Sequence, residues 1–416
     1  PMSLFGYPNV PRVSSGIHDP LYATSIYLED HEQALFLVGV DLLMLHHDFL
    51  RNCRERITQV TGVPTSQILV STTHTHSAPV TMEMLAFRDD PTLPVVDQGY
   101  LEMVFNAILE ASIQAKHNAQ PARIAFTSVE VNGVGCNRHD PQGPRDPELS
   151  IMLLKSQENN QLFAVSLVYA MHPTVLHEDS CLVSADFPGF TRQVLEEYFP
   201  GLTVLYQNGP CGNLSPRYHV NAQTFSEAAR LGAQLAVYAR EGIRHVAEAR
   251  FHAEPSLTGK STWVELLTRE YPSVAQAEKN LTAARAKYTH LKETGAPHGP
   301  LRTAEVVVFG AEESVVLAKA QANGELDLLR KDYARIEVQK LSVGSHIFYG
   351  LPGEMFVEYG LELKHRTESP ATVISLANGE LQGYIVTPGA EGYEANLSFF
   401  SDSAGQVLVE AALRLV

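Results

Sequence analysis

Two histidines that follow an apolar run near residue 70 could act chemically. The segment ILVSTTHTHSAP places His74 and His76 at the end of a predicted strand, where residues two apart point to the same face. We therefore expect both imidazoles in one pocket at the carboxyl edge of a parallel strand, where α/β enzymes place their sites. Such a pair suits one metal ligand and one acid/base or oxyanion partner. The alternative is a pair of polar residues that merely cap the strand.

Two further candidate ligands also follow predicted strands. His172 in YAMHPT ends a buried strand, and Pro173 requires an extended backbone there. Glu354 opens a predicted helix after a Leu-Pro-Gly turn, although a helix N-terminus favours a carboxylate for structural reasons alone. Asp186 in VSADFPGF precedes another predicted helix, as either its N-cap or a carboxylate that supports a metal ligand.

Three hydroxyl side chains lie in loops rich in glycine. Ser215 in NGPCGNLSPR could contact a substrate or belong to a plain turn. Tyr384 and Tyr393 in NGELQGYIVTPGAEGYEANLS could reach a site or be ordinary half-buried aromatics. Each signal is weak alone, but His, His, Glu and Tyr from four strand ends would form a site that zinc accepts.

The run His46-His47-Asp48 also looks like a metal site. It falls at the start of a predicted helix, however, where polar side chains commonly cap the helix or face solvent. We therefore expect capping and solvent exposure rather than metal binding at these three residues.

The elements that must position these residues form an α/β pattern. Apolar runs at 34–43 and 67–73 flank a segment with helical spacing, which predicts a β-α-β unit with parallel strands. The pattern recurs along the chain, with strands predicted at 163–171 and 202–207 and helices at 187–198 and 224–246. The predicted fold class is α/β, a mixed or parallel sheet flanked by helices.

A helical insertion interrupts this pattern. Residues 272–293 and 311–335 have helix-favouring composition and are separated by a Gly/Pro-rich turn, so we predict a helical hairpin. The predicted organisation is an α/β catalytic domain of residues 1–255 and 336–416, with 256–335 as a helical insertion or small subdomain. A strand at 346–350 resumes the catalytic domain.

The composition limits the classes of partner that the protein can bind. A net charge of −16 argues against nucleic acid and anionic membrane surfaces, and no apolar run reaches the roughly 18 to 20 residues of a membrane helix. We predict a soluble protein, and a homo-oligomer is left open.

The sequence opens at Pro1-Met2-Ser3 without a signal-peptide n-region, which leaves room for a removed leader or first strand and leaves the compartment open. There is no CxxC pair, and one or two disulfides are left open among Cys53, Cys136, Cys181 and Cys211.

An ordered set of motifs along most of the chain resembles the neutral/alkaline non-lysosomal ceramidases. The motifs are GYPNVPRVSSGIHDPLYA, STTHTHSAP, VGCNRHDP, YAMHPT, GNLSPR, LPGE and GYI followed by YEANLS. The resemblance implies one zinc ion per chain, held by His74, His172, Glu354 and Tyr384. It also implies that His76, Arg138 and Tyr393 surround the scissile carbonyl and act on the charge that develops there. We predict that the Ser215 hydroxyl positions the substrate rather than attacking it, because no histidine–acid pair beside it is evident in the sequence.

The implied function is a zinc-dependent hydrolase that cleaves a C–N amide bond of an N-acyl, lipid-like or sugar-derived small molecule. Three features depart from the family: the insertion at 256–335, a low aromatic content with the single tryptophan Trp263, and a sequence that stops soon after the YE motif. From the third feature we expect the immunoglobulin-like C-terminal domain of the family to be missing. The alternatives are a zinc hydrolase of an ester, lactone or carbohydrate derivative, and a non-catalytic binding protein that keeps the motifs as scaffold.

Overall fold

The computed structural model describes residues 1–7, 10–89, 92 and 96–415, so Pro8 and Asn9 of the first motif lie outside the described residues. Two sheets of predominantly apolar strands carry the candidate site. The first has the order β2 (Ala23–Glu29), β3 (Ala34–Val40) and β4 (Ile68–Thr72). The second has the order β10 (Thr203–Asn208), β8 (Leu162–Tyr169), β7 (Glu148–Ser156) and β5 (Ala122–Glu130).

The predicted parallel units are confirmed. β3 and β4 pair in parallel around helix α1 (His47–Thr61), and β8 and β10 pair in parallel around α3 (Asp186–Tyr198). Antiparallel pairs complete both sheets, β2 with β3 in the first and β7 with β5 and β8 in the second. The sheets are therefore mixed, and the fold class is the α/β arrangement that the sequence predicts.

Four strands form a third sheet, and three two-residue pairs lie around the strand ends. The third sheet has the order β12 (Leu257–Val264), β13 (Ile336–Val343), β14 (His346–Gly350) and β16 (Ala371–Ile374). The short pairs are β1 (Gly16–Ile17) with β9 (Leu182–Val183), β6 (Cys136–Asn137) with β11 (Leu214–Ser215), and β15 (Glu354–Met355) with β17 (Tyr384–Ile385).

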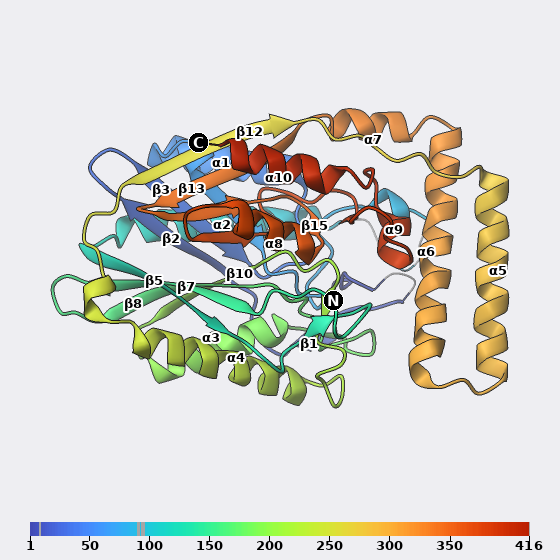
Figure 1. Cartoon of the computed structure of the whole chain (residues 1–416), viewed down its shortest axis with the longest axis horizontal. Helices are drawn as coiled ribbons and strands as arrows, with labels where there is room; N and C mark the ends of the chain where they lie inside the picture. The colour runs from blue at the N-terminus through green and yellow to red at the C-terminus, as the bar shows by residue number, and fades with distance from the viewer. Residues whose placement is uncertain (8–9, 90–91, 93–95, 416) are drawn as a thin grey trace.

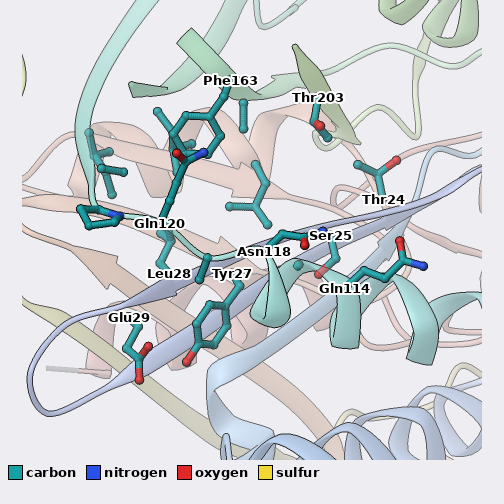
Figure 2. A pocket seen from close by; sticks show the side chains of 18 of the residues that line it. Thr24, Ser25, Tyr27, Leu28, Glu29, Gln114, Asn118, Gln120, Phe163 and Thr203 are labelled. Atoms are coloured by element: carbon teal, nitrogen blue, oxygen red, sulfur yellow. The ribbon is translucent and has the colours of Figure 1, made fainter. Parts of the chain in front are cut away.

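Helices cover the outer faces, and the sheets share an inner core (Figure 1). Ile26 and Leu37 of the first sheet pack with Leu205 of the second and Phe348 of the third. The covering helices are α1, α2 (Gln98–His117), α3, α4 (Phe225–His245), α8 (Val357–Arg366) and α10 (Ala404–Arg414), whereas the short α9 (Tyr393–Leu397) packs against the helical hairpin. A cavity of about 850 Å³ opens beside β2 (Figure 2).

The predicted helical hairpin is present, with different bounds. It consists of α5 (Val274–Glu293) and α6 (His298–Ala322), which stand side by side at one end of the molecule and are followed by α7 (Leu326–Asp332) (Figure 1). α6 begins inside the Gly/Pro-rich segment because proline is tolerated in the first turn of a helix. Strand β12 also lies within 256–335 and pairs with β13, so this stretch is not purely helical. Trp263 is part of β12.

Two expectations about the chain as a whole can be checked on the described residues. All four cysteines are free, so the disulfides that the sequence left open are not formed. No helix in the described part of the chain combines the length and the apolar composition that crossing a membrane requires.

Candidate metal centre

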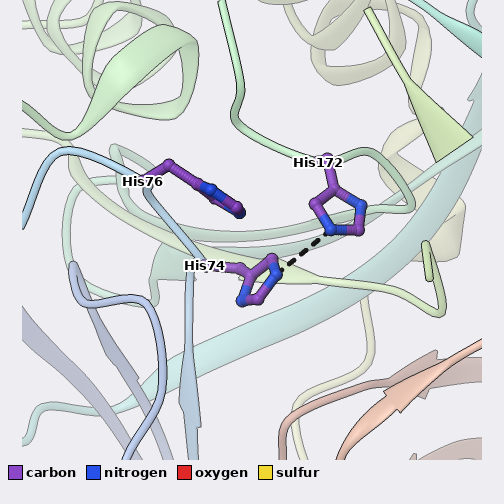
Figure 3. A group of neighbouring side chains, drawn as sticks. All are labelled: His74, His76 and His172. Atoms are coloured by element: carbon purple, nitrogen blue, oxygen red, sulfur yellow. Dashed lines mark hydrogen bonds between the residues drawn. The ribbon is translucent and has the colours of Figure 1, made fainter. Parts of the chain in front are cut away.

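His74 and His172 meet at the carboxyl ends of β4 and β8 (Figure 3). Their Nε2 atoms are 3.2 Å apart, and Glu354 Oε2 lies 3.1 Å from His74 Nε2 and 3.3 Å from His172 Nε2. His74 and His172 are at most 1% exposed and Glu354 is 8% exposed. Three candidate ligands from segments up to 280 residues apart therefore converge on one buried point.

Backbone carbonyls determine which nitrogen of each histidine carries the proton. His74 Nδ1 lies 2.8 Å from the oxygen of Leu43, and His172 Nδ1 lies 2.7 Å from the oxygen of Cys211. A carbonyl oxygen only accepts, so each Nδ1 is the donor and each Nε2 presents a lone pair. Burial lowers the pKa of His172 to about 4, which keeps this ring neutral.

Two lone pairs and a carboxylate oxygen thus face one another without a proton between them. Such a set of acceptors is unfavourable unless a cation lies among them. Its donor chemistry, two imidazoles and one carboxylate with the imidazoles oriented by carbonyls, fits a divalent metal ion.

Tyr384 is adjacent to Glu354 across a strand pair. β15 and β17 run in parallel with Glu354 opposite Tyr384, which brings two residues 30 apart in sequence to the same point. The sequence predicts a helix beginning at Glu354, but this residue lies in β15 and α8 begins at Val357, so a helix N-terminus does not explain the carboxylate. Burial and the charge of Glu354 raise the pKa of Tyr384 well above its ordinary value.

The strand argument for His74 and His76 is wrong in detail. β4 ends at Thr72, so both histidines lie in the loop beyond it, and His74 has a φ of 67°, which is uncommon for a residue with a side chain. The two rings nevertheless lie close together, with centroids 5.0 Å apart. Such backbone strain is found most often at functional sites.

His76 faces the same point as the two other histidines (Figure 3). One ligand-type atom from each of the three rings lies within 4.8 Å of the others. His76 Nδ1 lies 3.0 Å from the oxygen of Gly6, so its Nε2 carries the lone pair, and this atom is buried without a hydrogen-bond partner. Burial and the neighbouring His74 hold the pKa of His76 well below its ordinary value. The geometry allows a metal ligand or a proton acceptor here.

Arg138 and Tyr393 lie on the tyrosine side of the centre. Arg138 Nε donates to Glu394 Oε1 at 2.6 Å, and the guanidinium carbon lies 5.3 Å from the centroid of the Tyr384 ring. Tyr393 opens α9, and its ring centroid is 6.1 Å from that of Tyr384. Arg138 Nη2 is buried and has no well-directed hydrogen bond, although it also lies 2.6 Å from Glu394 Oε1.

Ser215 is buried in β11, next to the β6 strand that leads to Arg138. Its Oγ accepts the N–H of Arg217 at 3.2 Å, which is the plain-turn arrangement that the sequence left open. Asp186 is not an N-cap: it is the first residue of α3, and its carboxylate accepts the N–H groups of Leu176 and Phe187. It thereby holds the loop that carries His172.

The run His46-His47-Asp48 is a helix start, as predicted. His46 caps α1 by accepting the N–H of Asp48, and the side chains of the run are partly exposed. The tertiary structure adds Asp332 of α7, which lies 3.1 Å from His46 Nε2 and 3.5 Å from His47 Nε2. These contacts join the segment after the hairpin to α1.

Sequence reasoning did not single out two positioning residues. Arg12 is buried and donates to the backbone oxygens of His76 and Ser180, so it fixes the histidine loop. Asn208 at the end of β10 donates to the oxygen of Thr73 and accepts the N–H of Met171, which joins the two loops that carry the histidines. Both residues lie in motifs noted above, but nothing in their spacing indicates these contacts.

Fold and site together define an α/β protein with a buried centre of metal-ligand type at the strand ends. The family model for the N-terminal part of neutral/alkaline non-lysosomal ceramidases matches residues 1–210, about half of the chain, and the chain belongs to this family.

Several proteins with similar sequences are known as neutral ceramidases. Neutral ceramidase of Drosophila pseudoobscura pseudoobscura is 28% identical over 216 residues, and neutral ceramidase B of Dictyostelium discoideum is 22% identical over 217 residues. Each alignment covers 48% of this chain but 30% of the relative. The structure of neutral ceramidase from Pseudomonas aeruginosa superposes with a TM-score of 0.74 at 17% identity, over 100% of this chain and 73% of that one. A structure described as ceramidase complexed with C2 superposes with a TM-score of 0.75 at 17% identity, over 99% of this chain and 73% of that one. These likenesses show the fold.

Proposed function

We propose that the protein is a zinc-dependent hydrolase that cleaves the C–N amide bond of an N-acyl substrate. One observation carries the proposal: the Nε2 lone pairs of His74 and His172 and an oxygen of Glu354 lie within 3.1–3.3 Å of one another, with both Nδ1–H groups committed to carbonyls. Tyr384, opposite Glu354, completes the proposed set of four ligands for one ion. Zinc, when bound, supplies a water with a pKa near 7 and polarises the carbonyl that it faces.

The remaining side chains have separate proposed roles. The free lone pair of His76 Nε2 takes up the proton that the attacking water loses and passes it to the leaving nitrogen. Arg138 and Tyr393 donate hydrogen bonds to the oxygen that becomes negative as the carbonyl carbon turns tetrahedral, and their burial strengthens those bonds. Glu394 orients Arg138 through the 2.6 Å hydrogen bond to its Nε. Ser215 positions the substrate rather than attacking it, because its hydroxyl has no histidine partner among its hydrogen bonds.

Metal content and a substrate panel test the proposal. The purified protein should contain about one zinc per chain and should release the amine from short N-acyl amides. The panel should include esters, lactones and glycosides of matched size. Faster turnover of one of these classes would replace the amide assignment while keeping the metal, and a chain that takes up no zinc after supplementation would leave a non-catalytic binding protein.

A further inference from the structure

β2 is an edge strand with one open side. It pairs with β3 in a continuous register from Ala23–Val40 to Glu29–Ala34, and no other described strand pairs with it. The Asp41 N–H donates to the Tyr22 oxygen at one end of this ladder, and the Asp30 N–H donates to the Gln33 oxygen at the other. Backbone direction alternates along a strand, so the even-numbered residues of β2 bond to β3 and the odd-numbered ones point away.

The outward backbone groups of β2 have no partners. No hydrogen bond from the described part of the chain reaches the outward N–H and C=O groups of Ala23, Ser25, Tyr27 and Glu29. The hydroxyl of Ser25 is likewise buried without a partner. Proteins usually protect such an edge with proline, lysine, a bulge or a covering helix. Helix α2 packs against the Tyr27 face of β2, but the sequence ATSIYLE has no proline or lysine and its register has no bulge.

The open edge borders a cavity of about 850 Å³ (Figure 2). Residues 22–31 line it consecutively, so the strand forms one wall along its whole length. The other walls include Gln114 in the last turn of α2, Asn118 directly after that helix, and Phe163 and Thr203 at the starts of β8 and β10. The candidate metal centre lies at the opposite ends of β8 and β10, so the cavity is separate from it.

A polypeptide strand is the ligand that matches this wall. β2 offers alternating donors and acceptors over seven residues, roughly 23 Å, and an added strand satisfies such a row with its own backbone. Alternate side chains of that strand would lie beside Ile26 and Leu28, which face the core between the sheets, and these should be apolar. The others would lie on the face that carries Ser25 and Glu29.

The charge of the lining favours a basic segment. Four carboxylates line the cavity, and its one guanidinium, that of Arg192, is held by Asp41 at 2.6 Å. The carboxylates belong to Glu29, Asp30, Glu196 and Glu254. A second copy of this chain would bring the same acidic edge and a further net charge of −16, so it is disfavoured.

We propose that the open edge of β2 binds an extended segment of a partner polypeptide, in which basic and apolar residues alternate, as an added strand. This surface is independent of the hydrolase site. It would attach the partner to the side of the molecule remote from the metal ligands.

Peptide binding tests the proposal. A fluorescein-labelled nine-residue peptide of alternating Lys and Val should bind the full chain, as measured by anisotropy, and Glu in place of Lys should weaken binding at least 10-fold. The same Lys/Val peptide methylated at its amide nitrogens keeps the charge but cannot form the ladder, so it should also lose at least 10-fold. Equal binding of the methylated peptide would show attraction by charge alone and would overturn the proposal, as would no binding of the parent peptide.

Variants of β2 distinguish a loss of the binding edge from a loss of the folded structure. Ser25→Pro removes an outward N–H but no bond to β3, and proline is tolerated at such an edge position. It should abolish peptide binding, whereas Ser25→Ala should keep it, with the zinc content of both unchanged. Glu29→Lys reverses one of the lining charges and should also weaken binding of the basic peptide. Retained binding by Ser25→Pro, or a dimer in sedimentation that this variant dissociates, would overturn the proposal.

Discussion

At the residue scale, the tautomers of two histidines decide the chemistry. Leu43 and Cys211 contribute carbonyl oxygens, and these commit the Nδ1–H of His74 and of His172 so that both lone pairs face Glu354. The same side chains with their rings reversed would present protons to the carboxylate, and the site would be an ordinary hydrogen-bonded cluster. The arrangement therefore supports metal binding more strongly than the presence of two histidines does.

His74→Ala or His172→Ala should remove the metal. Each substitution deletes one of the proposed four ligands, and a large part of the metal's binding energy depends on the complete set. Elemental analysis should find close to no zinc in either variant, against about one per chain in the unsubstituted protein. Asp48→Ala, in the helix-capping run, is the matched control and should keep both the zinc and the activity. An unchanged zinc content in the histidine variants would contradict the assignment.

His76→Ala should leave the zinc in place and slow turnover. The proposed role of His76 is proton transfer, so its loss should cut kcat by roughly 100-fold or more. Zinc content and steady-state rates on the same preparation measure the two effects separately. If zinc is lost together with activity, His76 is a ligand, and an unaltered rate would remove it from the mechanism.

Glu394→Gln should remove an acid-sensitive part of the stability. Burial alone would raise the pKa of Glu394, but Arg138 lowers it to about 2, below the value near 4.3 of an unfolded chain. This stabilisation is fully present above about pH 4.3, is lost as the pH falls toward 2, and is on the order of 3 kcal/mol. The difference in unfolding free energy between parent and variant, measured from pH 6 to pH 2, should shrink over that window. A difference independent of pH would contradict the role of the pair.

At the element scale, α6 packs against the helix that carries Tyr393. A side chain added at Gly310 would first meet Tyr393 Cδ2 and Asn396 Nδ2, both at 3.4 Å. The hairpin thus borders the site at its tyrosine side, and Arg302 of α6 binds Glu178 at 3.0 Å. The division of the chain at 256 and 335 stays a prediction. The contact between Gly310 and Tyr393 places α6 of the hairpin directly beside one of the proposed site residues.

Gly310→Ala and Gly310→Leu form a graded test of that contact. A methyl group fits at 3.4 Å, so the alanine variant should keep its activity and gain up to about 1 kcal/mol in unfolding free energy from helix propensity. Leucine must displace Tyr393 and should lower kcat while zinc content stays the same. Equal rates in the two variants would show that the position of Tyr393 does not matter for turnover.

At the scale of the whole molecule, the proposed ion joins segments from most of the chain. The proposed ligands lie at 74, 172, 354 and 384, so an ion that binds them stabilises the folded chain against unfolding as a whole. Free zinc at 1,000 times its dissociation constant should add about 4 kcal/mol.

Chelation should therefore lower both Tm and activity. Thermal unfolding after dialysis against a chelator should occur at a lower temperature, and zinc should restore the parent Tm where magnesium does not. The His74→Ala variant is the control, because its Tm should not respond to zinc. A response of that variant equal to the parent's would place the stabilising ion elsewhere.

The sequence alone determined the elements and the candidate residues. Apolar periodicity predicted β3, α1, β4, β8, α3, β10 and α4, because burial on one face or two faces fixes these patterns locally. The motifs identified the family and every proposed ligand. Short elements were misassigned: the sequence placed Glu354 on a helix and Tyr384 in a loop, whereas both lie in two-residue strands that exist only because they pair with each other.

Tertiary structure decided what the candidates can do. The protonation of His74 and His172 depends on carbonyls supplied by Leu43 and Cys211, which lie 31 and 39 residues away. The open edge of β2 is likewise invisible in its sequence, since an edge strand and a paired strand can have the same apolar pattern. Local patterns determine which elements form, and contacts between distant segments determine which atoms of their side chains face one another.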